Sequence, residues 1–388
     1  MFAPFSITRG GPLHRLLWRA GFIRDARGDV WSLSKMLVAV TWLPLAALAL
    51  AERASAGKWP EVATDISVHT RLLVALPLML LGETAMEHRC ARVVAHVVKN
   101  ELVPREETAQ VAKLATRAET ARDAILPELI LLIAALAVGV LTLLGVLGPG
   151  GPLENLAQVR DVRSSRLWYA MVALPVFHFF TARSIWRWIL WTWLLSRVAQ
   201  LHVQPMPTHP DKAGGLQCLA APTVAIALVL MGVSAVVSGV WATDVLDANA
   251  ELTSFGSSAA ALLLASVAVA FGPLLMFSGH LYRARIRALR EYSEFSLTVA
   301  RRFHERWISR GTADASVLGS GDISALTDLA GNFESVVRSR LVPFGPRPVL
   351  VLAAAVIAPM VPLVAIEFPL LELASHIGKA LLGGRIPG

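Results

Sequence analysis

The sequence has 388 residues, of which 55% are hydrophobic and 16% are charged, and its mean hydropathy is +0.57. Soluble domains are nearer a quarter charged, so a chain this apolar needs a lipid bilayer as solvent for much of its surface. The net charge of +8 does not call for nucleic acid as a partner, because membrane proteins collect Lys and Arg on their cytoplasmic side. The composition therefore argues against a soluble protein and predicts one whose main partner is the lipid bilayer.

Seven apolar stretches come close to the length of about 20 residues that a helix needs to cross the hydrocarbon. They are residues 34–51, 67–84, 125–147, 167–190, 219–242, 258–280 and 348–368. The second is the weakest, because His69 and Arg71 stand at its start, and without it six would remain. We expect an all-α, polytopic membrane protein. Residues 1–30 should form a cytoplasmic or interfacial segment, and residues 31–388 a single membrane domain.

The distribution of Lys and Arg predicts which helix ends face the cytoplasm. With the N-terminus inside, the inner segments carry 28 of the 36 Lys and Arg residues, and the three outer loops carry six. Besides the N-terminal residues, the inner segments are helical insertions at 84–123, 183–218 and 281–347. We therefore expect a cytoplasmic N-terminus and, after seven spans, a C-terminus on the outside.

Three of the expected helices contain a proline at the same phase. Pro77, Pro175 and Pro273 are spaced 98 residues apart, and an arginine follows each of them by 12 residues. A proline removes one backbone hydrogen bond and kinks its helix. We predict three repeated helix pairs and one unpaired span. Internal repeats with kinked helices are frequent in transporters, although three parallel repeats are not the usual arrangement there.

The insertion at 281–347 has a helical pattern of its own. In residues 281–310 the apolar side chains recur at steps of three or four, which predicts an amphipathic helix that continues past the membrane. A second amphipathic helix is expected at 322–340. It can cover the apolar face of the first, and a partner protein or a second subunit of a homo-oligomer is the alternative cover.

His178 is the ionisable residue nearest to the middle of any expected span. An ionisable group inside the membrane is costly to bury and marks a functional site by default. Arg183 and Arg187 lie one and two turns further along the same helix. We take His178 and Arg183 as a candidate intramembrane polar site. In the alternative interpretation the two arginines anchor the helix at the interface.

Carboxylates gather at the expected cytoplasmic ends of the spans. Glu83 and Glu87 follow the second span, and His280 ends the sixth. These three residues could line a vestibule, or they could be ordinary solvated helix ends. Glu128 stands near the start of the third span, where a carboxylate suits a helix N-terminus.

The stretch at residues 207–216, Pro-Thr-His-Pro-Asp-Lys-Ala-Gly-Gly-Leu, is the most distinctive string in the chain. His209 and Asp211 could bind a metal or move a proton, and the amides of Gly214 and Gly215 could face an anion. The alternative is a stiff turn built from prolines and glycines. Two ligands are too few for a zinc site, so we expect neither a metal nor a cofactor.

This string, together with residues 322–329 and 340–344, resembles a family of bacterial polytopic membrane proteins to which no activity is attached. The resemblance covers most of the chain. It implies a multi-pass protein of the bacterial inner membrane, and it carries over no substrate, cofactor or catalytic residue.

Three functions fit these features. The first is a channel or transporter for a small solute or ion, which rests on the kinked repeats and His178. The second is a membrane-embedded signalling or assembly scaffold that uses its cytoplasmic helices. The third is an integral membrane enzyme with His209 and Asp211 at the cytoplasmic face. The enzyme ranks last because the sequence has no phosphate-binding loop, no dinucleotide fingerprint and no nucleophile elbow.

Overall fold

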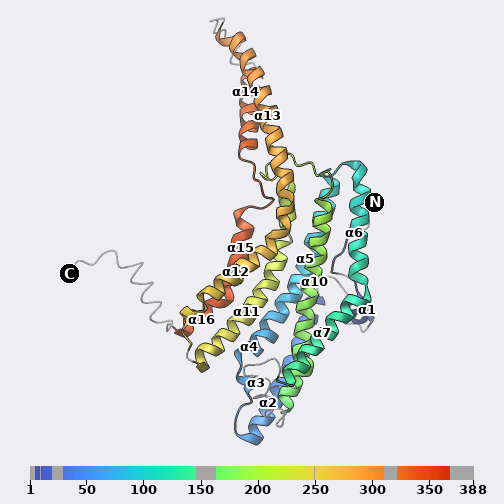
Figure 1. Ribbon diagram of the computed structural model, residues 1–388, viewed down its shortest axis with the longest axis vertical. Helices are drawn as coiled ribbons and strands as arrows, with labels where there is room; N and C mark the ends of the chain where they lie inside the picture. The colour runs from blue at the N-terminus through green and yellow to red at the C-terminus, as the bar shows by residue number, and fades with distance from the viewer. Residues whose placement is uncertain are drawn as a thin grey trace, which may run out of the picture.

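The computed structural model describes residues 5–8, 10–19, 29–145, 163–248, 250–309 and 321–367, and these residues form helices and turns without any strand. The α-helices are α1 (Pro12–Arg19), α2 (Asp29–Ala56), α3 (Glu61–Thr64), α4 (Ile66–His69), α5 (Leu76–Lys99), α6 (Thr108–Asp123), α7 (Ile125–Leu143), α9 (Ser164–Trp168), α10 (Leu174–Val198), α11 (Thr223–Ala248), α12 (Gly256–Phe271), α13 (Ser278–Phe303), α14 (Gly321–Val337), α15 (Pro346–Ile357) and α16 (Val361–Glu367). Figure 1 shows the long helices as an elongated bundle, from one end of which α13 and α14 project.

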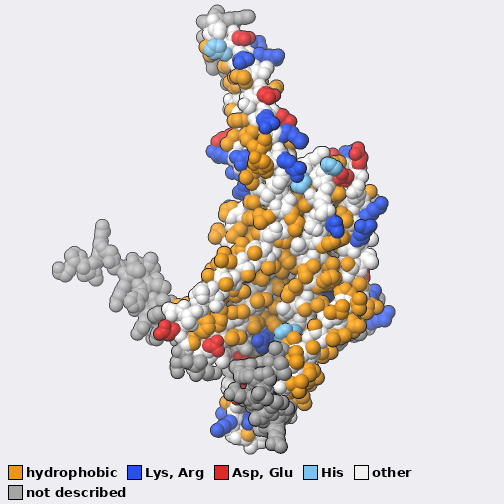
Figure 2. All heavy atoms as spheres, viewed as in Figure 1, with side chains coloured by type: hydrophobic (Ala, Val, Ile, Leu, Met, Phe, Trp, Pro, Cys, Tyr) orange, Lys and Arg blue, Asp and Glu red, His pale blue; other side chains and the backbone are white. Residues whose placement is uncertain are grey.

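Six helical stretches in the described part are long and apolar enough to cross a membrane. They are Val30–Ala56, Ile66–Lys99, Ile125–Leu143, Leu216–Leu246, Leu252–Ile308 and Pro346–Ala365. The expected all-α class and membrane-spanning helices are confirmed at this level. Figure 2 agrees, because hydrophobic side chains cover the body of the bundle while Lys and Arg gather on the projecting helices and near α6.

The six match all but one of the seven expected spans. The weakest expected span, 67–84, is among the six, whereas the expected span at 167–190 is not. That region is α9, a short π-helical stretch and α10, and its apolar run is interrupted by His178 and Arg183. It nevertheless packs along α7 and α5 inside the bundle. The side on which the C-terminus lies concerns residues 368–388, which are outside the described residues.

The first two predicted repeats share a backbone irregularity. A π-helical stretch, η1 (Thr70–Ala75), precedes α5 and Pro77, and another, η3 (Tyr169–Ala173), precedes α10 and Pro175. The Arg71 guanidinium donates a hydrogen bond to the Tyr169 hydroxyl, and these two residues are themselves 98 positions apart. In the third predicted repeat, Pro273 lies in a 3-10 stretch, η6 (Gly272–Phe277). The first two predicted repeats are thus alike in backbone, and the third departs from them.

Helix α11 packs against α5, η1 and α15, and small or hydroxylated residues make these contacts. The Ser234 and Ser238 hydroxyls each donate to a carbonyl of the last helices, those of Val356 and Pro359, at 2.6 Å. Membrane helices gain no hydrophobic stabilisation when they associate, because the surrounding lipid is as apolar as their side chains. Hydrogen bonds and close backbone contacts of this kind hold such helices together instead.

Helices α13 and α14 lie side by side as an antiparallel pair that extends beyond the bundle (Figure 1). Leu329 and Val336 of α14 are buried, and the Arg285 guanidinium donates to the Val337 carbonyl at 2.7 Å. Helix α14 therefore occupies the place expected for a cover of the 281–310 helix. Part of the pair stays open, since Phe295 is 59% exposed.

Candidate functional site

Six buried, charged side chains from four helices meet beside the junction of α6 and α7, partway along α5 and α10. We call them the charged cluster: Glu83 and Glu87 from α5, Arg122 from α6, Glu128 from α7, and Arg183 and Arg187 from α10. The pairs on α5 and α10 are four residues apart, so each pair lies on one face of its helix. Three carboxylates and three guanidinium groups thus face one another where four helices converge.

Ion pairs join three of these helices. Arg183 Nη1 lies 3.2 Å from Glu83 Oε2, and Arg183 Nε lies 3.6 Å from Glu128 Oε1. Arg187 Nη2 lies 3.6 Å from the same Glu128 oxygen. A charge buried without a partner is strongly destabilising, so each member needs the others. The cluster therefore holds α5, α7 and α10 in register with one another.

The N-terminal segment, which we define as residues 5–8 and 10–13, lies against this cluster. Glu87 Oε2 accepts hydrogen bonds from Ile7 N at 2.9 Å, from Thr8 N at 2.8 Å and from Thr8 Oγ1 at 2.9 Å. Arg187 Nη1 donates to the Ile7 carbonyl at 2.6 Å, and Arg187 Nη2 donates to the Gly10 carbonyl at 3.3 Å. Two members of the cluster thus bind the backbone of the segment.

Further charged side chains of α6 and α7 satisfy the rest of this backbone. Arg122 Nη1 donates to the Ser6 carbonyl at 2.7 Å, and Glu128 Oε2 accepts from Leu13 N at 2.9 Å. Asp123 Oδ1 accepts from Gly11 N at 2.8 Å. Buried backbone groups must find such partners, so the segment is an integral part of the fold where it lies against these helices.

Gly11 is the residue at which the segment comes closest to the cluster. Its φ of +88° suits glycine, and a Cβ there would lie 2.5 Å from Glu128 Oε1. Larger residues would therefore be strained in backbone and would collide with the carboxylate. The N-terminal segment therefore needs glycine at position 11 to follow this path.

The cluster unites residues that the sequence assigned to separate sites. Glu83 and Glu87 of the expected vestibule lie in it together with Arg183 of the expected intramembrane site. The interpretation of Arg183 and Arg187 as interfacial anchors is wrong, because both are buried and paired with carboxylates.

His178 and His280 make other contacts. His178 is half-buried, its Nδ1 lies 2.9 Å from the Leu174 carbonyl of its own helix, and its ring meets the edge of Phe177. His280 is also half-buried, with a hydrogen bond to the backbone of Leu201. Arg183 thus pairs with Glu83, and in the described part of the chain no hydrogen bond or ion pair joins His178 or His280 to the charged cluster.

Asp211 organises the turn before α11. Its Oδ1 accepts hydrogen bonds from Ala213 N at 2.8 Å and Gly215 N at 3.1 Å, and its Oδ2 accepts from Gln217 N at 3.1 Å. His209 Nδ1 lies 2.9 Å from the same Oδ1. An aspartate that binds several backbone amides stabilises a turn, so these contacts favour the structural interpretation of this string.

The same turn is tied to two other parts of the chain. Gly214 has a φ of +64°, and a Cβ there would lie 2.5 Å from Pro205 Cβ. The Arg340 N–H donates to the Lys212 carbonyl at 2.6 Å, which connects the turn to the loop before α15. Across the described residues no group of three or more His, Cys, Asp or Glu could hold a metal ion.

We expect Asp211→Asn to weaken the acid sensitivity of the protein. Burial raises the pKa of Asp211, but hydrogen bonds from three backbone N–H groups and His209 outweigh it, and the pKa lies below its ordinary value. Stability from a lowered pKa is present above the unfolded value of about 3.9 and is lost as the pH falls through the folded value. Thermal unfolding in detergent at several pH values should show a smaller decline toward acid pH for the variant, with lower stability at pH 7. Asp328→Asn, at an exposed carboxylate of α14, should leave the profile unchanged, and an unaltered profile for Asp211→Asn would contradict this role.

Comparison of the chain with family models, with curated proteins and with solved structures gave no match. The family resemblance of residues 209–216 therefore stays a prediction.

Proposed function

We propose that this chain is a seven-span membrane protein that moves a small solute or ion across the bilayer, with the charged cluster as its gate on the cytoplasmic side. The observation that carries the proposal is the burial of six charged residues among α5, α6, α7 and α10 under the N-terminal segment. Paired ionisable residues inside a membrane domain mark ion and substrate pathways. Helix α10 is the seventh span, since it packs along α7 and α5.

Two bend points lie next to the gate. Glu83 follows Pro77 and η1 on α5, and Arg183 follows Pro175 and η3 on α10. Prolines and π-helical turns are the ordinary causes of helix kinks and are frequent at functional sites. Bending at either point would separate Glu83 from Arg183 and lift the N-terminal segment from Glu87. Opening therefore requires that the Glu83–Arg183 ion pair and the hydrogen bonds between Glu87 and the N-terminal segment break together.

We expect Gly11→Ala to increase flux through the protein. The new Cβ would collide with the Glu128 carboxylate and push the N-terminal segment away from the gate. Purified full-length protein in liposomes, with proton-, potassium- or chloride-sensitive dyes inside, measures this directly. The matched control is Gly57→Ala, because Gly57 has a φ of +72° but no atom within 4 Å of its Cβ position. That variant has similar backbone strain without the collision, and its flux should equal that of the wild type.

The proposal fails if neither the wild type nor Gly11→Ala gives flux above empty liposomes for any of these ions. His178→Ala adds a second readout on the same vesicles. A change in flux would mean that His178 lies on the path of the transported ion. Unchanged flux would mean that the transport site consists of the charged cluster without His178.

A membrane scaffold is the second candidate, and the projecting pair α13 and α14 favours it. Exposed apolar side chains such as Tyr282, Phe295 and Leu297 lie along α13, where a partner could bind. If the protein is a scaffold, neither the wild type nor Gly11→Ala should show flux. An enzyme that uses His209 and Asp211 stays third, since backbone amides already occupy both Asp211 oxygens.

A further inference from the structure

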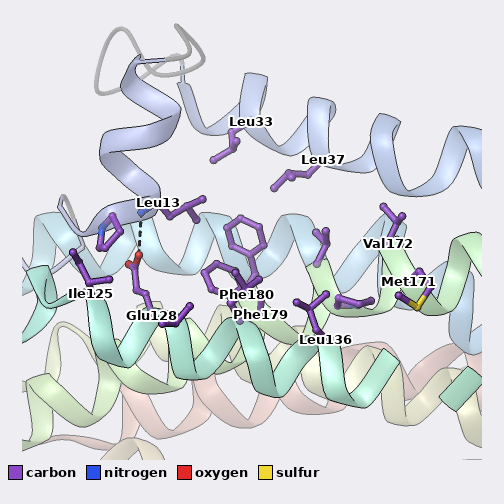
Figure 3. A pocket seen from close by; sticks show the side chains of 15 residues that line it. Leu13, Leu33, Leu37, Ile125, Glu128, Leu136, Met171, Val172, Phe179 and Phe180 are labelled. Carbon is purple, nitrogen blue, oxygen red and sulfur yellow. Dashed lines mark hydrogen bonds between the residues drawn. The ribbon is translucent and has the colours of Figure 1, made fainter. Parts of the chain in front are cut away.

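An apolar groove of about 510 Å³ lies between α2 on one side and α7 with α10 on the other (Figure 3). It is lined by 15 residues, and Glu128 at one end is the only one of them that is not apolar. Leu33 and Leu37 of α2 face it from one wall, and Phe179 and Phe180 of α10 face it from the other. Helix α1 covers the end at which Glu128 binds Leu13 N.

The shape and surroundings of this groove suit a hydrocarbon chain. Its lining residues on α7 run from Ile125 to Leu136, which is about 16 Å of helix at ~1.5 Å per residue. Leu129, Leu132 and Leu136 stay partly exposed along it, so the groove is open to the side. Both α2 and α7 are candidate spans, and the medium beside them is therefore lipid.

Two basic residues are exposed on the helix that covers this end of the groove, Arg15 and Arg19 of α1. The nearby carboxylates are already paired with other arginines, Glu128 with Arg183 and Arg187, and Asp123 with Arg122. Exposed Lys and Arg next to the membrane attract anionic lipid headgroups.

We infer that this groove binds one acyl chain of an anionic phospholipid, whose headgroup lies on Arg15 and Arg19 of α1. The inference does not rest on transport, because a scaffold or an enzyme could hold the same lipid. The bound chain fills the space between α2 and the α7–α10 pair. It thereby connects α1, and through Leu13 the N-terminal segment, to the surrounding bilayer.

The test compares lipid retained by full-length protein in nanodiscs and then in detergent, measured by native mass spectrometry. The two probes are phosphatidylglycerol and phosphatidylcholine with the same acyl chains. Leu132→Trp fills the groove and should reduce retained phosphatidylglycerol by roughly tenfold or more, because little of the chain can then be buried. The matched control is Leu264→Trp, at a residue of α12 that is 70% exposed and does not line the groove, and it should retain as much lipid as the wild type.

A second pair of variants tests the headgroup and guards against misfolding. Arg15→Gln with Arg19→Gln should remove the preference for phosphatidylglycerol over phosphatidylcholine. Met171→Trp fills the groove from η3, the stretch before α10, and repeats the first test if Leu132→Trp does not fold. Equal phosphatidylglycerol retention in the wild type and in the folded groove-filling variant would overturn the site. Equal retention of the two lipids by the wild type would overturn the anionic ligand.

Discussion

Replacing Arg187 by methionine is expected to lower the free energy of unfolding by about 3–5 kcal/mol. The side chain is 1% exposed, pairs with Glu128, and donates to the carbonyls of Ile7 and Gly10. Methionine fills similar space but leaves one carboxylate with a single arginine partner and two backbone carbonyls without their donor. Denaturant unfolding in detergent micelles, followed by tryptophan fluorescence, measures the loss.

Two comparisons separate this effect from a general effect of losing an arginine. Arg105→Met removes a guanidinium that is 84% exposed and paired with Glu101, and it should cost less than about 1 kcal/mol. Adding Glu128→Gln to Arg187→Met removes the excess negative charge that Arg187→Met leaves in the cluster, while Leu13 N keeps an acceptor. The double variant should lose less than the sum of the single variants, because contacting residues couple. An Arg187→Met loss as small as that of Arg105→Met would mean that water reaches the cluster.

Gly139→Ala is expected to destabilise the bundle by about 2–3 kcal/mol through overpacking. A Cβ at Gly139 of α7 would lie 2.2 Å from the Ala170 carbonyl oxygen and 2.9 Å from Pro175 Cγ. Neither atom can rotate away, since one is backbone and the other is in a proline ring. The two helices would have to separate along the contact that positions Glu128 against Arg183. Thermal unfolding in detergent measures the change.

Gly331→Ala is the matched control for this contact. Gly331 also lies inside a helix, α14, but no atom lies within 4 Å of its Cβ position. Alanine there should stabilise the helix by about 0.5–1 kcal/mol, because it reduces the entropy lost on folding. Opposite signs for the two alanine variants support the close approach of α7 and η3. The same sign for both would contradict it.

The amino-acid sequence alone was enough to predict helices and membrane burial. Runs such as 125–147 and 219–242 contain enough apolar residues that no soluble fold could cover them, and both correspond to helices apolar enough to cross a membrane. The prolines 98 residues apart also marked two real irregularities, at η1 and η3. These features are local, because a helix satisfies its own backbone and reveals its environment through side chains a few positions apart.

The charged cluster was decided by tertiary structure. Glu83 and Arg183 were recognised as polar residues near helix ends, yet nothing in the sequence indicated that they would pair across 100 positions. The sequence analysis does not include Arg122 among the site residues, and it predicts residues 1–30 as a cytoplasmic or interfacial segment without their contacts to buried charges. The adjacent Gly10 and Gly11 are the local signal of a close approach there. A charge's environment depends on which helices pack beside it, and periodicity within one helix does not specify its neighbours. The sequence therefore indicates which helices are apolar enough to cross a membrane, and only the packing of α5, α6, α7 and α10 determines which charges become buried together.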